Sequence, residues 1–209
     1  MMHKVDPHKG GAFQVKPPHI ISDLQVHQDR TFIDEEKVCF LFACIPFCVV
    51  DEESDTIWAF QASHLWVNVL RSLGGNWNFI KQTKNLHKLK YPVPVKKMDV
   101  MVFDPTMFHS TAPNLSTKIR YAISITVLRK NHQFVYYFKN KLIDDDLIEK
   151  HEVDKKFYFG YVFSSKPDES KLKKTVAQYL PFALTKIELA KPFKKHLPKD
   201  AIHNTKNIK

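Results

Sequence analysis

Apolar residues occur along the first two thirds of the chain in short stretches, several of which alternate with polar residues. Alternation with a period of two is typical of a strand with one buried face, and a continuous β-branched and aromatic stretch is typical of a strand buried on both faces. This pattern predicts strands at 20–27, 38–50, 56–61, 99–103, 119–128 and 133–138. Many short strands separated by turn residues favour an antiparallel sandwich or barrel.

Two connections between these strands can be predicted as well. Asn131 and His132 are turn formers, so we expect the strands at 119–128 and 133–138 to form a hairpin. The stretch 73–90 contains a Gly-Gly pair and many Asn and Lys residues, which indicates a surface loop.

The last third of the chain has a different pattern. Its first part opens with an acidic run, which suits the positive amino end of a helix, and we expect a helix over 144–156. A second helix is expected over 169–190, where Pro181 must break or kink it. We therefore expect a single domain over 1–209, with a β core over 20–140 and a helical, lysine-rich region over 141–209.

Composition narrows the class of protein. A chain of 209 residues with 44% hydrophobic residues can form one globular domain with its own core. Its five glycines cannot be arranged into the Rossmann or P-loop phosphate-binding motifs, which excludes both. The three cysteines, Cys39, Cys44 and Cys48, lack the C-x-x-C spacing of zinc sites and indicate buried thiols in a reducing compartment.

Location and charge add two expectations. The longest apolar stretch, 38–50, is shorter than the roughly 20 residues that span a bilayer, and the amino terminus lacks a signal-peptide pattern, so we expect a cytoplasmic protein without a membrane partner. The net charge is +10, and residues 166–209 hold eleven lysines against four acids. A solvated helix face with a basic tail explains this surplus, and binding to nucleic acid or to an anionic ligand is the alternative.

Two segments contain residues suited to catalysis. His27 and Asp29 lie two apart, so in an extended chain their side chains point to the same side. His109 lies far downstream, and Arg120 follows it by eleven residues. Two imidazoles and one carboxylate on one face of a metal, with three positions left open, form the facial triad of non-haem Fe(II) oxygenases.

The sequences around these residues form an ordered set of motifs. The set comprises VHQD at 26–29, SDTIWAFQASH at 54–64, MDVMVFD at 98–104 and HSTAPNLS at 109–116, with Arg120 after them. Together they resemble the phytanoyl-CoA dioxygenase family of Fe(II)- and 2-oxoglutarate-dependent oxygenases, over about residues 20–128.

The chain departs from the family pattern in three places. Ala62 and Met98 stand where the family usually has glycine, and both changes would stiffen turns without removing a ligand. Only 26 residues precede His27, whereas family members carry further strands and helices there, including residues that help to hold 2-oxoglutarate. This departure motivates an alternative, a catalytically inactive member that acts as a binding or scaffold protein.

The resemblance implies a double-stranded β-helix core (jelly-roll, cupin-like) with carboxy-terminal helices. It assigns His27, Asp29 and His109 to Fe(II) and Arg120 to the distal carboxylate of 2-oxoglutarate, a role that suits the planar guanidinium. Thr111 and Ser124 are further candidates for binding 2-oxoglutarate. The implied activity is hydroxylation of a small substrate, which the net charge suggests is anionic, with no nucleic-acid partner.

Each candidate also has an ordinary structural interpretation. His27 and His109 could be unremarkable strand residues, and Arg120 could form an ion pair with Asp99 or Asp104. His64 is expected to be structural or to lie at a pocket rim. We expect Trp58 and Phe60 in the core or a pocket wall, and Asn114 as the cap of a turn.

Overall fold

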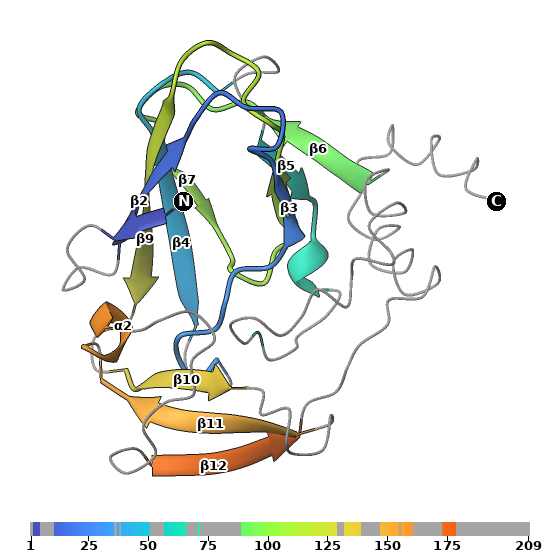
Figure 1. Cartoon of the computed structure of the whole chain (residues 1–209). Coiled ribbons are helices and arrows are strands. Elements are labelled where there is room, and N and C mark those ends of the chain that lie inside the picture. Colours follow the sequence, from blue (N-terminus) through green and yellow to red (C-terminus); the bar gives the residue numbers. More distant parts are fainter. Residues whose placement is uncertain are drawn as a thin grey trace, which may run out of the picture.

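The structure is a computed structural model of the whole chain, shown in Figure 1. It describes residues 2–4, 11–35, 37, 39–50, 57–65, 71, 89–128, 132–138, 147–154, 156–160 and 173–178. The predicted loop at 73–90 lies outside the described residues up to position 88, and so does the lysine-rich region apart from 173–178. In the described part of the chain no helix is long and apolar enough to cross a membrane.

A five-stranded antiparallel sheet forms one wall of the core. Its strands, in spatial order, are β1 (Met2–Lys4), β2 (Gly11–Lys16), β9 (Arg120–Leu128), β4 (Phe40–Pro46) and β7 (Met101–Phe103). The strand predicted at 38–50 is thus β4, and it lies between two neighbours as its mainly apolar sequence requires. β1 and β2 lie outside the strands predicted from the sequence.

A four-stranded antiparallel sheet faces the first one (Figure 1). Its order is β3 (Leu24–His27), β8 (His109–Thr111), β5 (Ile57–Phe60) and β6 (Lys90–Val93), and a single 3₁₀ turn, η2 (Ser63–Leu65), follows β5. From β2 to β5 and from β6 to β9 the chain passes from one sheet to the other at every step. This is the topology of a double-stranded β-helix, so the predicted jelly-roll core is confirmed.

Aromatic residues occupy part of the space between the sheets. Ile33, Phe40 and Phe42 form a buried cluster, against which Phe103 packs. The ring of Phe103 on β7 lies 5.1 Å from that of His109 on β8, measured between centroids, so the inner faces of the two sheets meet at that point. The apolar core therefore extends up to His109, one of the candidate metal ligands.

A third, three-stranded sheet lies at the lower end of Figure 1. It consists of β10 (Phe134–Phe138), β11 (Leu147–Val153) and β12 (Lys173–Gln178), with the short helix α2 (Phe157–Gly160) between β11 and β12. The prediction of a helix over 144–156 is wrong, because β11 covers most of these residues. The helix predicted over 169–190 is wrong at 173–178, where β12 lies, and its remaining residues lie outside the described ones.

Two further expectations need correction. The hairpin predicted around Asn131 and His132 does not form, because β9 pairs with β2 and β4 while β10 pairs with β11. All three cysteines are free, as expected, but only Cys44 is buried, since Cys39 is exposed and Cys48 is half-buried. The remaining predicted strands coincide with β3, β5, β7, β9 and β10, with shorter bounds at the amino ends of several.

Candidate metal centre

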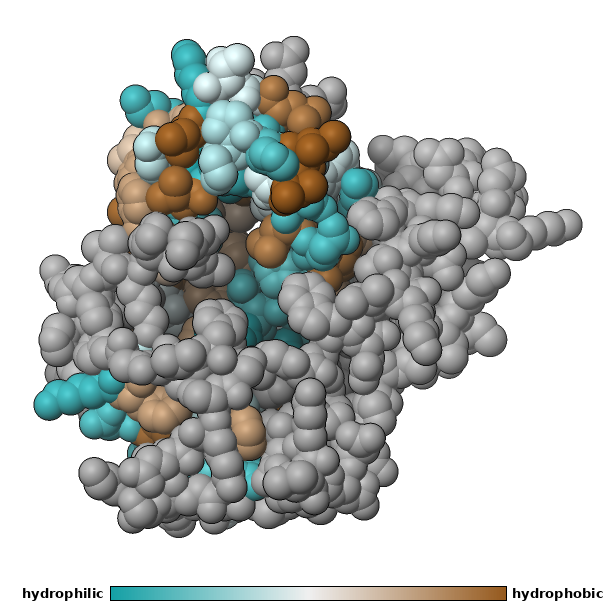
Figure 2. Space-filling model, in the orientation of Figure 1, coloured by the Kyte–Doolittle hydropathy of each residue, from teal (hydrophilic) through white to brown (hydrophobic). Residues whose placement is uncertain are grey.

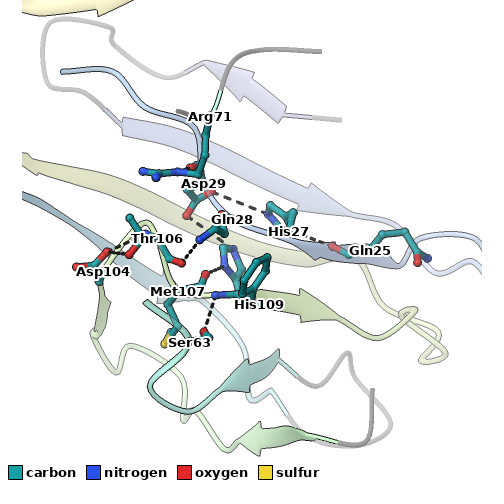
Figure 3. Close-up of polar contacts among 11 residues, drawn as sticks. Gln25, His27, Gln28, Asp29, Ser63, Arg71, Asp104, Thr106, Met107 and His109 are labelled. Atoms are coloured by element: carbon teal, nitrogen blue, oxygen red, sulfur yellow. Dashed lines mark hydrogen bonds and ion pairs between the residues drawn. The ribbon is translucent and has the colours of Figure 1, made fainter. Parts of the chain in front are cut away.

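The antiparallel pairing of β3 and β8 brings the two candidate histidines together. His27 is the last residue of β3, His109 is the first residue of β8, and the two are directly paired across the strands. A register irregularity between Leu24 and His27 accompanies this pairing. The two imidazole rings lie 4.2 Å apart between centroids. Their nitrogens and an Asp29 carboxylate oxygen all lie within 4.8 Å of one another, as Figure 3 illustrates.

The orientation of each imidazole is fixed by the main chain. His27 Nδ1 lies 2.7 Å from the carbonyl oxygen of Gln25, and His109 Nδ1 lies 3.1 Å from that of Met107. A carbonyl can only accept, so each Nδ1 must donate, and in the neutral ring Nε2 then has the lone pair. The two Nε2 atoms lie 4.0 Å and 3.7 Å from the two carboxylate oxygens of Asp29.

Burial favours the neutral imidazoles, which are the form that binds metals. It lowers the pKa of His27 to about 4, with a smaller contribution from the neighbouring His109, and it also lowers the pKa of His109. Burial raises the pKa of Asp29, although His27, Arg30 and Arg71 oppose that shift. Asp29 is half-buried between the two neutral imidazoles, and its carboxylate offers a negative ligand to a divalent cation. The donor set therefore fits Fe(II) or a similar ion.

The loop between β7 and β8 supports the same segment. The Asp29 amide donates to the carbonyl oxygen of Pro105 over 2.9 Å, and the Gln28 side chain donates to that of Thr106. From the other side, Ser63 Oγ accepts a 2.8 Å hydrogen bond from the amide of Phe108, next to His109. Ser63 is fully buried whereas His64 is exposed, so within the ASH turn the serine supports the site.

The structure places the proposed 2-oxoglutarate residues on facing strands. Arg120 is buried at the start of β9, and Ser124 follows on the same face of that strand. Thr111 ends β8, and its Oγ1 accepts a 2.7 Å hydrogen bond from Lys16 Nζ. Lys16 pairs directly with Arg120 across β2 and β9, so their side chains emerge on the same face. Figure 2 shows that this side of the molecule is hollowed between the two sheets, with hydrophilic residues on part of the wall.

Lys16 is a candidate that the sequence analysis missed. Its strand has a readable signal, because Phe13 and Val15 alternate with Ala12, Gln14 and Lys16 in the sequence GAFQVK. The remaining expectations concern packing. Phe60 is fully buried, the ammonium of Lys90 lies 4.1 Å from the Trp58 ring centroid, and Asn114 caps its turn by accepting from the amide of Ser116 over 3.2 Å.

A sequence profile of the phytanoyl-CoA dioxygenase family matches residues 5–122, more than half of the chain. The chain belongs to this family. The match contains His27, Asp29, His109 and Arg120. Ala62 and Met98, where the resemblance leads us to expect glycine, both adopt a left-handed backbone, with φ of 58° and 69°. The turns therefore keep a backbone conformation that suits glycine although the glycines are absent.

Several solved structures are similar in fold to this chain. They include the non-heme alpha ketoglutarate dependent carbocyclase SnoK from nogalamycin biosynthesis, with 21% identity over 59% of this chain and 50% of that chain and a TM-score of 0.49. EvdO2 from Micromonospora carbonacea var. aurantiaca, complexed with 2-oxoglutarate, shows 18% identity over 56% of this chain and 50% of that chain, with a TM-score of 0.46. The chain thus spans about half the length of these two proteins. No curated protein gives a significant match.

Proposed function

We propose that this protein is an Fe(II)- and 2-oxoglutarate-dependent dioxygenase that hydroxylates a small anionic substrate. The observation that carries the proposal is the convergence of His27, Asp29 and His109, whose ligand atoms lie within 4.8 Å of one another. Family membership supports the same chemistry. In the overall reaction, 2-oxoglutarate, dioxygen and a C–H group give succinate, carbon dioxide and a C–OH group.

Each residue has a distinct task in this proposal. His27, Asp29 and His109 would hold Fe(II), which when bound supplies the open coordination positions and the electrons for activating dioxygen. Arg120 and Lys16 would bind the distal carboxylate of 2-oxoglutarate, and Thr111 and Ser124 would offer hydroxyl groups to the same cosubstrate. Phe103 and the aromatic cluster behind it shield one side of His109 from water. The net charge of +10 favours an anionic substrate.

Replacing His109 with Ala should abolish metal uptake, because two remaining ligands cannot complete the facial triad. The measurement is anaerobic titration of the full chain with Fe(II) and 2-oxoglutarate, monitored by the weak visible absorption of the chelated complex. His64→Ala is the matched control, because His64 is exposed and lies outside the three-residue site. We expect about one Fe(II) per chain in wild type and in His64→Ala, and none in His109→Ala.

The same titration can refute the proposal. Equal Fe(II) uptake by His109→Ala and wild type would remove the metal assignment. If wild type binds both Fe(II) and 2-oxoglutarate but forms no succinate in air, the inactive binding protein becomes the better description. Loss of the absorption band in Arg120→Ala with Fe(II) uptake retained would support the cosubstrate assignment.

A further inference from the structure

Arg71 connects two parts of the segment that contains Asp29. This arginine comes from the chain after β5, and its side chain is 6% exposed. Its Nε donates a 2.5 Å hydrogen bond to the main-chain carbonyl oxygen of Asp29, and its Nη2 forms an ion pair with Glu35. Its own carbonyl oxygen accepts a 3.2 Å hydrogen bond from the amide of Thr31. Figure 3 shows Arg71 directly beside Asp29.

Asp29 lies beyond the end of β3, where its amide bonds to the Pro105 carbonyl oxygen and Arg71 adds a restraint on the carbonyl oxygen of Asp29. The paired part of that strand ends at His27, so the β3–β8 ladder fixes the two histidines but does not include the aspartate. A planar guanidinium that bonds two acceptors at once restrains both position and rotation, and Glu35 in turn restrains the guanidinium. The contact between Arg71 and Asp29 spans 42 positions in sequence, so it also ties the chain after β5 to the site.

We propose that Arg71, held by Glu35, is a positioning residue that keeps the Asp29 carboxylate aligned with the two histidines for metal binding. The inference rests on the proposed function. Arg71 acts through the main chain of Asp29 and through the ion pair, and has no direct contact with the metal or substrate in this role.

Charge alone predicts the opposite effect of removing Arg71. A cation close to a metal site repels the metal ion, so its removal would strengthen metal binding if electrostatics dominated. Positioning predicts weaker binding, because a mobile Asp29 must be ordered when the ion binds. Arg71→Lys separates the two effects again, since lysine keeps the charge but cannot bond both acceptors with a planar fork.

The experiment is Co(II) titration of the metal-free full chain, monitored by the visible spectrum of the bound ion. We expect the Co(II) dissociation constant to rise about 10- to 100-fold in Arg71→Ala, the usual effect of removing a group that orients a metal ligand. Arg71→Lys and Glu35→Gln should give smaller increases. Lys37→Ala is the matched control, because Lys37 pairs with Asp34 in the same segment and is 76% exposed, and its dissociation constant should stay within about twofold of wild type.

A double-mutant cycle tests whether the pair acts as a unit. Glu35→Ala should weaken Co(II) binding in the wild-type background and have almost no further effect in Arg71→Ala. Thermal unfolding of each metal-free variant shows whether it folds, and if Arg71→Ala does not, Arg71→Lys and Glu35→Gln provide the same comparison. Wild-type affinity or tighter binding in the folded arginine variants would overturn the positioning role alone. Absence of Co(II) binding by wild type would overturn both this inference and the proposed function.

Discussion

At the residue scale, the left-handed backbone of Met98 lowers the stability of the folded state. Its φ is 69°, its side chain is 57% exposed, and its amide donates a 2.8 Å hydrogen bond to the carbonyl oxygen of Pro46. A left-handed conformation costs a residue with a Cβ about 1–2 kcal/mol, whereas glycine loses about 0.5–1 kcal/mol through the entropy of the unfolded chain. Met98→Gly should therefore stabilise the fold by about 0.5–1 kcal/mol, measured by urea unfolding.

The neighbouring residue provides the control for this prediction. Lys97 is also exposed and has no left-handed backbone, so Lys97→Gly gains nothing in the native state and should destabilise the protein by about 0.5–1 kcal/mol. Equal destabilisation by both substitutions would show that the Met98 turn has no strain that glycine can relieve.

The residues of the site differ in how far the sequence reveals them. His27 and Asp29 are two apart in an extended segment, and His109 lies in a distinctive motif, but it is the resemblance of the ordered motifs to the family pattern that selects all three. Arg71 has no local signal, because its partners Asp29 and Glu35 lie in a distant segment and only the completed fold brings them together. Lys16 has a signal in its alternating strand, although that strand is not among those predicted from the sequence.

At the element scale, β11 shows why the carboxy-terminal prediction failed. The sequence LIEKHEV is rich in charged residues and follows an acidic run, a pattern that favours a helix capped by that run. Glu149 and His151 are in fact completely buried on one face of the strand, where His151 Nε2 lies 3.0 Å from Glu149 Oε2. Ile148 is buried on the other face with Val135 and Tyr137. Polar residues that contact each other inside a sheet look like solvent-facing residues in a sequence.

The buried pair predicts a strong coupling within this strand. Glu149→Leu and His151→Leu should each cost about 2–4 kcal/mol in urea unfolding, because each leaves a buried polar group without this partner. The double variant should cost at least about 1 kcal/mol less than the sum, since it removes both polar groups. Strictly additive costs would mean that the contact between the two side chains contributes nothing to stability.

At the scale of the whole molecule, the third sheet packs against the segment that follows Asp29. The Val135 amide donates a 2.9 Å hydrogen bond to the carbonyl oxygen of Phe32, and Ile33 forms a β-bridge with Phe134. Lys150 Nζ on β11 lies 2.7 Å from Asp34 Oδ2. The family profile ends at residue 122, before this sheet begins. The third sheet, which lies beyond the family match, thus contacts the same segment after Asp29 that Arg71 contacts.

The ion pair between Lys150 and Asp34 gives a pH-dependent test of this connection. Burial alone would raise the pKa of Asp34, but hydrogen bonds from Lys150 and Lys37 lower it below its usual 3.8. A carboxyl whose pKa is lower in the folded state stabilises the fold above pH 3.8, and that contribution disappears as the pH falls through the folded-state pKa.

Lys150→Met should cost about 1–2 kcal/mol at pH 7, between the values for exposed and buried pairs, because Lys37 still compensates part of the charge. The difference from wild type in urea unfolding should stay nearly constant from pH 7 to about pH 4 and should shrink as the pH falls below 3.8. A difference that stays constant well below pH 3.8 would indicate that the lysine stem stabilises the junction by packing, and that the charge connecting the third sheet to the Asp29 segment is dispensable.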